Sequence, residues 1–111
     1  MKYGLARKLY IYHFETQKGE ELIATGGDYT RSQLWCKKNL NDVDTELADL
    51  FQSLAWVWYA LKRNGKLADY GVSAELTQEG LLEMFDGLTF QFESFAEDAL
   101  PLASTPTQPK K

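Results

Sequence analysis

Cysteine and histidine are nearly missing from the 111 residues, which contain one cysteine, Cys36, and one histidine, His13. A lone cysteine excludes an internal disulfide and a zinc site made of four cysteines, and a lone histidine removes most catalytic triads and histidine–metal sites. We interpret His13, which lies in an aromatic run, as a packed or surface residue. Neighbouring lysines such as Lys37 and Lys38 can lower the pKa of a thiol, but we interpret Cys36 as a free structural thiol. We therefore expect a non-enzymatic protein with no cofactor and no metal.

Basic residues and long apolar runs are also scarce. Lys and Arg number 12 against 16 Asp and Glu, and the net charge is −4. This balance argues against general nucleic-acid binding, which needs basic surface. The longest apolar stretch, residues 54–61, is far shorter than the roughly 20 residues of a membrane span. The first residues also lack the apolar segment of a secretory signal. The sequence predicts a soluble, cytoplasmic protein that binds neither nucleic acid nor a membrane.

Proline is restricted to positions 101, 106 and 109. Residues 101–111 are therefore expected to form a flexible, disordered tail. The composition as a whole is 44% hydrophobic and 14% aromatic, which is enough apolar mass for one modest core. We predict a single domain over residues 1–100. Its expected class is mainly α, a small helical domain built on a long central helix.

The strongest helix signal covers residues 45–64. Asp44 or Thr45 can serve as the N-cap, and Gly65 follows the last turn as a stop signal. Acidic residues near the start and basic residues near the end suit the helix dipole. The apolar residues that recur at helical spacing, and so predict a core-facing side, are Leu47, Leu50, Phe51, Leu54, Trp58 and Leu61.

Trp56 and Tyr59 lie outside this apolar stripe, in the centre of the same predicted helix. A helix that is apolar nearly all round is either buried on several sides or in contact with a partner. Full burial is hard to arrange in a chain this small. The sequence alone leaves both interpretations open.

The N-terminal part favours a β-hairpin. Residues 8–14 are β-branched and aromatic, and alternate side chains would face opposite sides of a strand. A turn signal at residues 17–19 precedes a short apolar segment, residues 22–24, that can return as a second strand. Residues 5–12 also have apolar positions at helical spacing, so a helix is the alternative. With the hairpin, the class becomes α+β.

The glycine pair in residues 26–28 is expected to break the chain direction. Thr30 or Ser32 would then cap a short helix that ends near Lys38. Residues 25–28 lack the glycine spacing of a phosphate-binding loop. We therefore interpret them as a turn.

Thr77 is expected to cap a further helix that Gly87 ends. Apolar residues in 88–99 recur at helical spacing and predict a last short helix. Phe90 and Phe92 alternate with polar neighbours, however, so a strand is the rival interpretation.

Acidic residues gather in the second half of the chain. Residues 69–100 carry eight acids and no base, whereas residues 1–43 carry seven bases and five acids. Such a segment is either a solvated surface or a docking face. A docking face would suit a basic partner, or the basic N-terminal part of another copy.

Residues 54–63 read Leu-Ala-Trp-Val-Trp-Tyr-Ala-Leu-Lys-Arg, and residues 76–86, after a glycine break, read Leu-Thr-Gln-Glu-Gly-Leu-Leu-Glu-Met-Phe-Asp. With the proline-bearing tail, this layout resembles the small tail-assembly chaperones of long-tailed, siphovirus-type bacteriophages over about residues 44–96. The resemblance implies a non-catalytic chaperone in the host cytoplasm. Such a chaperone binds the tape-measure protein and keeps it soluble until tail-tube subunits polymerise around it.

This role implies an apolar surface for the tape-measure protein, with the tail-tube protein as a second partner and self-association as a further option. Large aromatic side chains dominate binding energy at interfaces. The candidate partner-binding residues are Trp56, Trp58, Tyr59, Phe85, Phe92 and Phe95.

The competing hypothesis is a small acidic regulatory or inhibitory protein that binds a basic surface of a host or phage protein. Salt discriminates between the two, because a charge-driven complex weakens strongly with ionic strength and an apolar one does not.

Overall fold

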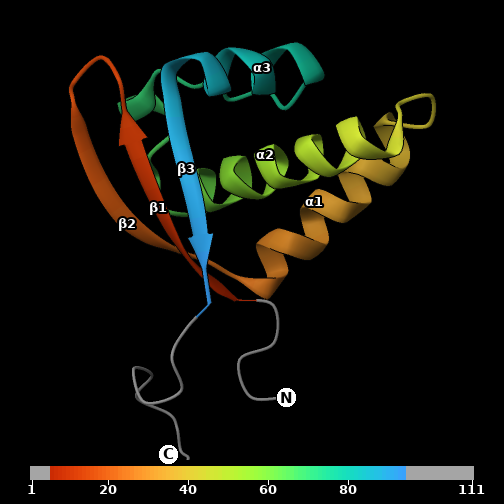
Figure 1. Cartoon of the computed structure of the whole chain (residues 1–111), viewed down its shortest axis with the longest axis horizontal. Helices are drawn as coiled ribbons and strands as arrows, with labels where there is room; N and C mark the ends of the chain where they lie inside the picture. Colours follow the sequence, from red (N-terminus) through yellow and green to blue (C-terminus); the bar gives the residue numbers. More distant parts are fainter. Residues whose placement is uncertain (1–5, 95–111) are drawn as a thin grey trace, which may run out of the picture.

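The computed structural model describes residues 6–94, in which three antiparallel strands form one layer and the helices pack against one face of it (Figure 1). The expected mainly-α class is wrong and the α+β alternative is right, because a third strand joins the predicted N-terminal hairpin. The predicted tail, residues 101–111, lies outside the described residues. The elements in chain order are β1 (Arg7–His13), β2 (Lys18–Ala24), α1 (Gly26–Asn39), α2 (Thr45–Arg63), a short 3-10 helix η1 (Ala68–Tyr70), α3 (Gln78–Gly87) and β3 (Leu88–Glu93).

β1 is the central strand of the sheet, antiparallel to β2 on one side and to β3 on the other. Leu9, Ile11 and His13 are buried on the inner face, whereas Tyr12 is exposed on the outer face. This confirms the alternation predicted for residues 8–14, which is the pattern of a strand with one face toward a core.

α1 begins earlier than predicted, because Thr25 rather than Thr30 or Ser32 is its N-cap. Thr25 Oγ1 accepts the Asp28 N–H at 3.1 Å, and Asp28 Oδ2 accepts the Thr25 N–H at 3.1 Å. This reciprocal capping box satisfies two backbone donors and offsets the low helix propensity of two glycines. The predicted break at residues 26–28 is therefore wrong, since these residues form the first helical turn.

α2 follows its prediction closely, from the Asp44 N-cap to Gly65, whose φ of 71° is the left-handed conformation that ends many helices. It lies between α1 and α3 and packs against the sheet (Figure 1). Three surrounding elements thus achieve the burial that the sequence made hard to foresee. None of the helices within residues 6–94 has the length and apolar character needed to cross a membrane. The buried central residues of α2 are Leu54, Ala55, Trp56, Val57, Trp58, Ala60 and Leu61.

α3 begins where predicted. Thr77 Oγ1 accepts the Gly80 N–H at 2.9 Å, which caps the helix. Leu81 and Met84 are buried against the rest of the molecule. The helical periodicity of this segment therefore places one apolar side inward.

β3 follows α3 directly after Gly87. The helix predicted over residues 88–99 is wrong in its described part, and the strand interpretation is confirmed. Pairing with β1 decides between the two, because it turns Phe90 and Phe92 toward the inner face with the other apolar residues.

Candidate functional site

A row of aromatic rings joins the surface of α3 to the core. Phe85 of α3 lies 5.7 Å from Phe90 of β3, measured between ring centroids, and Phe90 lies 5.6 Å from Phe92. Phe92 stacks on Trp56 of α2 at 4.4 Å, and Trp56 meets Tyr29 of α1 edge-on at 4.8 Å. The row therefore ties β3 to all three α-helices, in geometries that aromatic pairs favour.

The outer end of this row lies beside a second exposed apolar side chain. Leu82 and Phe85 are 40% and 38% exposed, whereas Leu81 and Met84 of the same helix are buried. Residues three apart are neighbours on a helix surface, so Leu82 and Phe85 lie side by side. Exposed acids surround the pair. We call the following residues the α3 patch: Leu82, Phe85, Glu79, Glu83 and Asp86.

The outer edge of β3 has no strand beside it within residues 6–94. The Phe14 N–H donates to the Gly87 carbonyl oxygen at 3.0 Å, one pair beyond the β1–β3 ladder. Because bonded and non-bonded pairs alternate in an antiparallel ladder, Phe90 and Phe92 direct their N–H and C=O groups away from β1. We call these backbone groups the free β3 edge.

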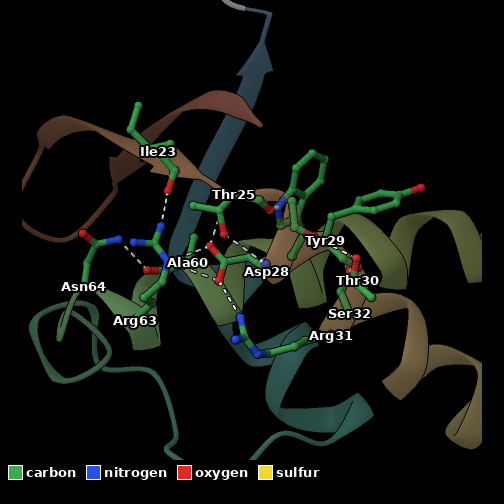
Figure 2. A network of polar contacts seen from close by, with 12 residues as sticks. Ile23, Thr25, Asp28, Tyr29, Thr30, Arg31, Ser32, Ala60, Arg63 and Asn64 are labelled. Carbon is green, nitrogen blue, oxygen red and sulfur yellow. Dashed lines mark hydrogen bonds and ion pairs between the residues drawn. The ribbon is translucent and has the colours of Figure 1, made fainter. Parts of the chain in front are cut away.

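At the opposite edge, that of β2, Arg63 from the end of α2 covers the backbone at Ile23, as Figure 2 shows. Arg63 donates from Nη2 to the Ile23 carbonyl oxygen, which the same alternation turns away from β1. Arg63 Nε also donates to Asp28, at 3.2 Å from Oδ1 and 3.0 Å from Oδ2. The Asp28 side chain is 1% exposed and that of Arg63 is 40% exposed. A buried carboxylate therefore holds the guanidinium in place against the strand.

A second polar cluster secures β2 to the segment that follows α2. The Tyr70 hydroxyl donates to Glu20 Oε1, and Lys66 Nζ lies 3.1 Å from Glu20 Oε2. The Tyr70 hydrogen bond, with help from Lys66, holds the pKa of Glu20 below its ordinary value. Burial and the bond to Glu20 raise the pKa of Tyr70. These groups favour a charged Glu20 and a neutral Tyr70.

The outer face of the sheet carries a shallow hollow of about 500 Å³. Gly19 lies opposite Tyr12 in the β1–β2 ladder, so no side chain fills the space there. The Tyr10 hydroxyl donates to Glu93 Oε1 at 2.9 Å, and this bond, with partial burial and nearby Glu21, raises the pKa of Tyr10. The hollow is lined by Tyr10, Ile11, Tyr12, Gly19, Glu20, Glu21, Thr89, Phe90 and Gln91.

Two of the six predicted partner-binding residues lie in the core. Trp56 and Trp58 are 8% and 3% exposed. Their indole N–H groups donate to the carbonyl oxygens of Thr25 and Ser73, at 3.1 and 3.0 Å. A buried ring with a satisfied N–H offers no surface to a partner unless the core opens. We therefore leave both tryptophans out of the candidate surface.

The other four predicted residues are not gathered at one place. Phe85 is exposed in the α3 patch, Tyr59 and Phe92 are half-buried, and Phe95 lies outside the described residues. Sequence reasoning missed the exposure of Leu82 and the free β3 edge. The alternation of polar and aromatic residues over 88–93 was the signal for the strand, because it is typical of a strand with one solvated face, but its place at the edge depends on the pairing with β1.

Cys36 is half-buried and His13 is buried. Burial raises the pKa of the half-buried Cys36 thiol, which is opposite to the direction that Lys37 and Lys38 would favour. His13 is buried, with Nδ1 3.2 Å from Thr16 Oγ1. Within residues 6–94, no three His, Cys, Asp or Glu side chains come together in a way that could hold a metal ion.

Comparison of the chain with protein-family models, with curated proteins and with solved structures finds no match.

Proposed function

We propose that this chain is a phage tail-assembly chaperone that binds the tape-measure protein in the host cytoplasm, keeps it soluble during tail assembly and catalyses no reaction. The α3 patch carries the proposal. Leu82 and Phe85 are adjacent, large and about two-fifths exposed. A partner helix with an apolar stripe gains free energy by removing such side chains from water.

The charges around the patch fit a partner whose apolar stripe is flanked by basic residues. Residues 69–94 carry six acids and no base. Like-signed charge of this kind steers a basic partner toward the surface and keeps unbound copies apart. The acids therefore support both recognition and solubility.

The test is co-expression of the tape-measure protein with this chain, followed by measurement of the soluble fraction of the tape-measure protein after centrifugation. The double variant Leu82→Ser/Phe85→Ser is expected to lose most of the solubilising effect. Leu34→Ser is the matched control, because Leu34 is also an exposed leucine but lies on α1. Thermal unfolding of all three chains shows whether they fold. A folded double variant that solubilises its partner as well as the unchanged chain would overturn the proposal.

The same six acids favour a second candidate, an acidic regulatory protein that binds a basic surface. Its complex would depend on charge, whereas the α3 patch binds through apolar contact. Raising the salt concentration from about 0.1 M to about 1 M shortens the screening length to about 3 Å. A dissociation constant that rises by more than roughly tenfold over this range supports the acidic regulator. A smaller rise supports the chaperone, because its acids steer a complex that apolar contact holds together.

A further inference from the structure

We propose that the free β3 edge binds an extended segment of another protein, in which apolar residues alternate with basic ones, as a fourth strand of the sheet. This goes beyond the proposed function, because it concerns backbone groups of β3 and not the apolar side chains of α3. Those backbone groups point outward from the sheet. Phe90 and Phe92 together present two N–H donors and two carbonyl acceptors away from β1.

Within residues 6–94, β3 lacks the usual protection of an edge strand. Natural edges are blocked by proline, by charged side chains, by bulges or by covering segments. Residues 88–93 contain no proline and one charged residue, Glu93. Glu93 accepts a hydrogen bond from Tyr10 on the outer face, so it does not cover the backbone. The Leu88 N–H is bonded to the Met84 carbonyl oxygen, and the open ladder thus begins at the Leu88 carbonyl.

The chemistry of the occupant follows from the side chains of β3. Side chains of an added strand lie beside those of β3 on both faces of the sheet. On the inner face they would meet Phe90 and Phe92, which calls for apolar residues. On the outer face they would meet Thr89, Gln91 and Glu93, which calls for polar or basic residues. The segment therefore alternates, with a period of two.

Charge decides between another protein and a second copy of this chain. Residues 69–94, which include β3 and the helix before it, carry six acids and no base. Symmetric pairing of two β3 edges would bring two such acidic regions together, at a cost in electrostatic repulsion. A basic segment from another protein is attracted to the same region.

The experiment uses the full chain labelled for NMR and a short peptide in which valine alternates with lysine. The amide signals of Phe90 and Phe92 are expected to shift most on titration. Methylating alternate backbone nitrogens of the peptide removes donors but keeps its side chains, and is expected to weaken binding by roughly tenfold or more. Replacing lysine by glutamate is expected to weaken it as well.

A pair of variants tests the backbone directly. Phe90→Pro removes both the aromatic ring and the outward N–H, whereas Phe90→Val removes the ring and keeps the N–H. Proline is tolerated at such an edge position, so the first variant is expected to fold. With both chains folded, the valine variant should bind the peptide and the proline variant should bind it at least roughly tenfold more weakly. Equal binding by both, or by the methylated peptide, overturns the proposal.

Hydrogen exchange of the chain without peptide shows whether a second copy, or another part of the same chain, already occupies the free β3 edge. Fast exchange at Phe90 and Phe92, beside slow exchange at Gln91, is the expected result. Protection that disappears on dilution would identify a second copy at the edge, and protection at every dilution would identify the chain's own residues there. Either result overturns the proposal.

The Leu82→Ser/Phe85→Ser variant is expected to keep peptide binding, so failure of the chaperone test is distinguishable from failure of peptide binding at the free β3 edge.

Discussion

The two edges of the sheet differ in how α2 supports them. At β2, Arg63 at the end of the helix donates to the Ile23 carbonyl oxygen and so satisfies one of the outward backbone groups. At β3, Trp56 at the centre of the helix stacks on Phe92 and contacts a side chain only. One helix therefore holds a backbone group at one edge and a side chain at the other. A strand added at β2 would compete with Arg63 for the Ile23 carbonyl oxygen, whereas α2 holds β3 through the Phe92 ring.

Removing the support of β3 should have the largest effect on stability. Trp56→Ala deletes a buried ring that contacts Phe92 and Tyr29 and donates to the Thr25 carbonyl. We expect a loss of about 4 kcal/mol in the free energy of unfolding, measured by denaturant titration. Trp56→Phe keeps an aromatic ring and should lose about half as much. A loss below about 1 kcal/mol for Trp56→Ala would mean that this ring does not hold β3.

Removing the support of β2 should come next. Arg63→Ala leaves the buried Asp28 carboxylate without its main partner and exposes the Ile23 carbonyl. We expect a loss of about 2 to 3 kcal/mol, because Arg63 is partly solvated and water replaces some of its bonds. Arg31→Ala is the control, since Arg31 lies 3.5 Å from Asp28 and is 58% exposed. Its loss should stay below about 1 kcal/mol, and equal losses for the two arginines would contradict this account.

The aromatic row offers a milder way to weaken the β3 side. Phe85→Ser removes an exposed ring that contacts Phe90. The expected loss is about 1 kcal/mol, the size of one aromatic pair with partial burial. Leu34→Ser, in an exposed position on α1, should change the melting temperature very little. If Phe85→Ser were as destabilising as Trp56→Ala, the exposed end of the aromatic row would contribute as much to stability as its buried end, which would contradict this account.

The smallest effect concerns acid stability at β2. The pKa of Glu20 is lower in the folded chain than its ordinary value of 4.5. Its stabilising contribution is therefore fully present above the ordinary value and is lost as the pH falls through the folded-state pKa. Glu20→Gln should cost less than about 1 kcal/mol at neutral pH, because the carboxylate is partly solvated. The difference in stability from the unchanged chain should shrink at acid pH, and a difference independent of pH would contradict the pKa assignment.

Local signals in the sequence were sufficient for most of the helices and for the hairpin. The cap at Thr77, the N-cap position of Asp44, the glycine at position 65 and the alternation of residues 8–14 each lie within a few residues of the element they define. The exception was α1, where Thr25 and Asp28 form a capping box around two glycines. Composition favoured a break there, and two side-chain hydrogen bonds overrode it.

The surface residues were harder to predict, because exposure depends on what packs from elsewhere in the chain. Trp56 and Leu82 are both large apolar residues on helices, yet the sheet and α1 cover the first and nothing within residues 6–94 fully covers the second. Asp28 and Arg63 are 35 residues apart, and no local pattern connects them. The pairing of β3 with β1, which decides both edges, is likewise a contact between distant segments.

The register of β3 also has a consequence for synthesis of the chain. Glu93 pairs with Lys8, so the last described strand completes a sheet whose first strand leaves the ribosome far earlier. β1 and β2 can pair as soon as the hairpin emerges, whereas closing so long a loop is slow. During translation β1 is itself an open strand, and the nascent hairpin is then most exposed to pairing with other nascent chains.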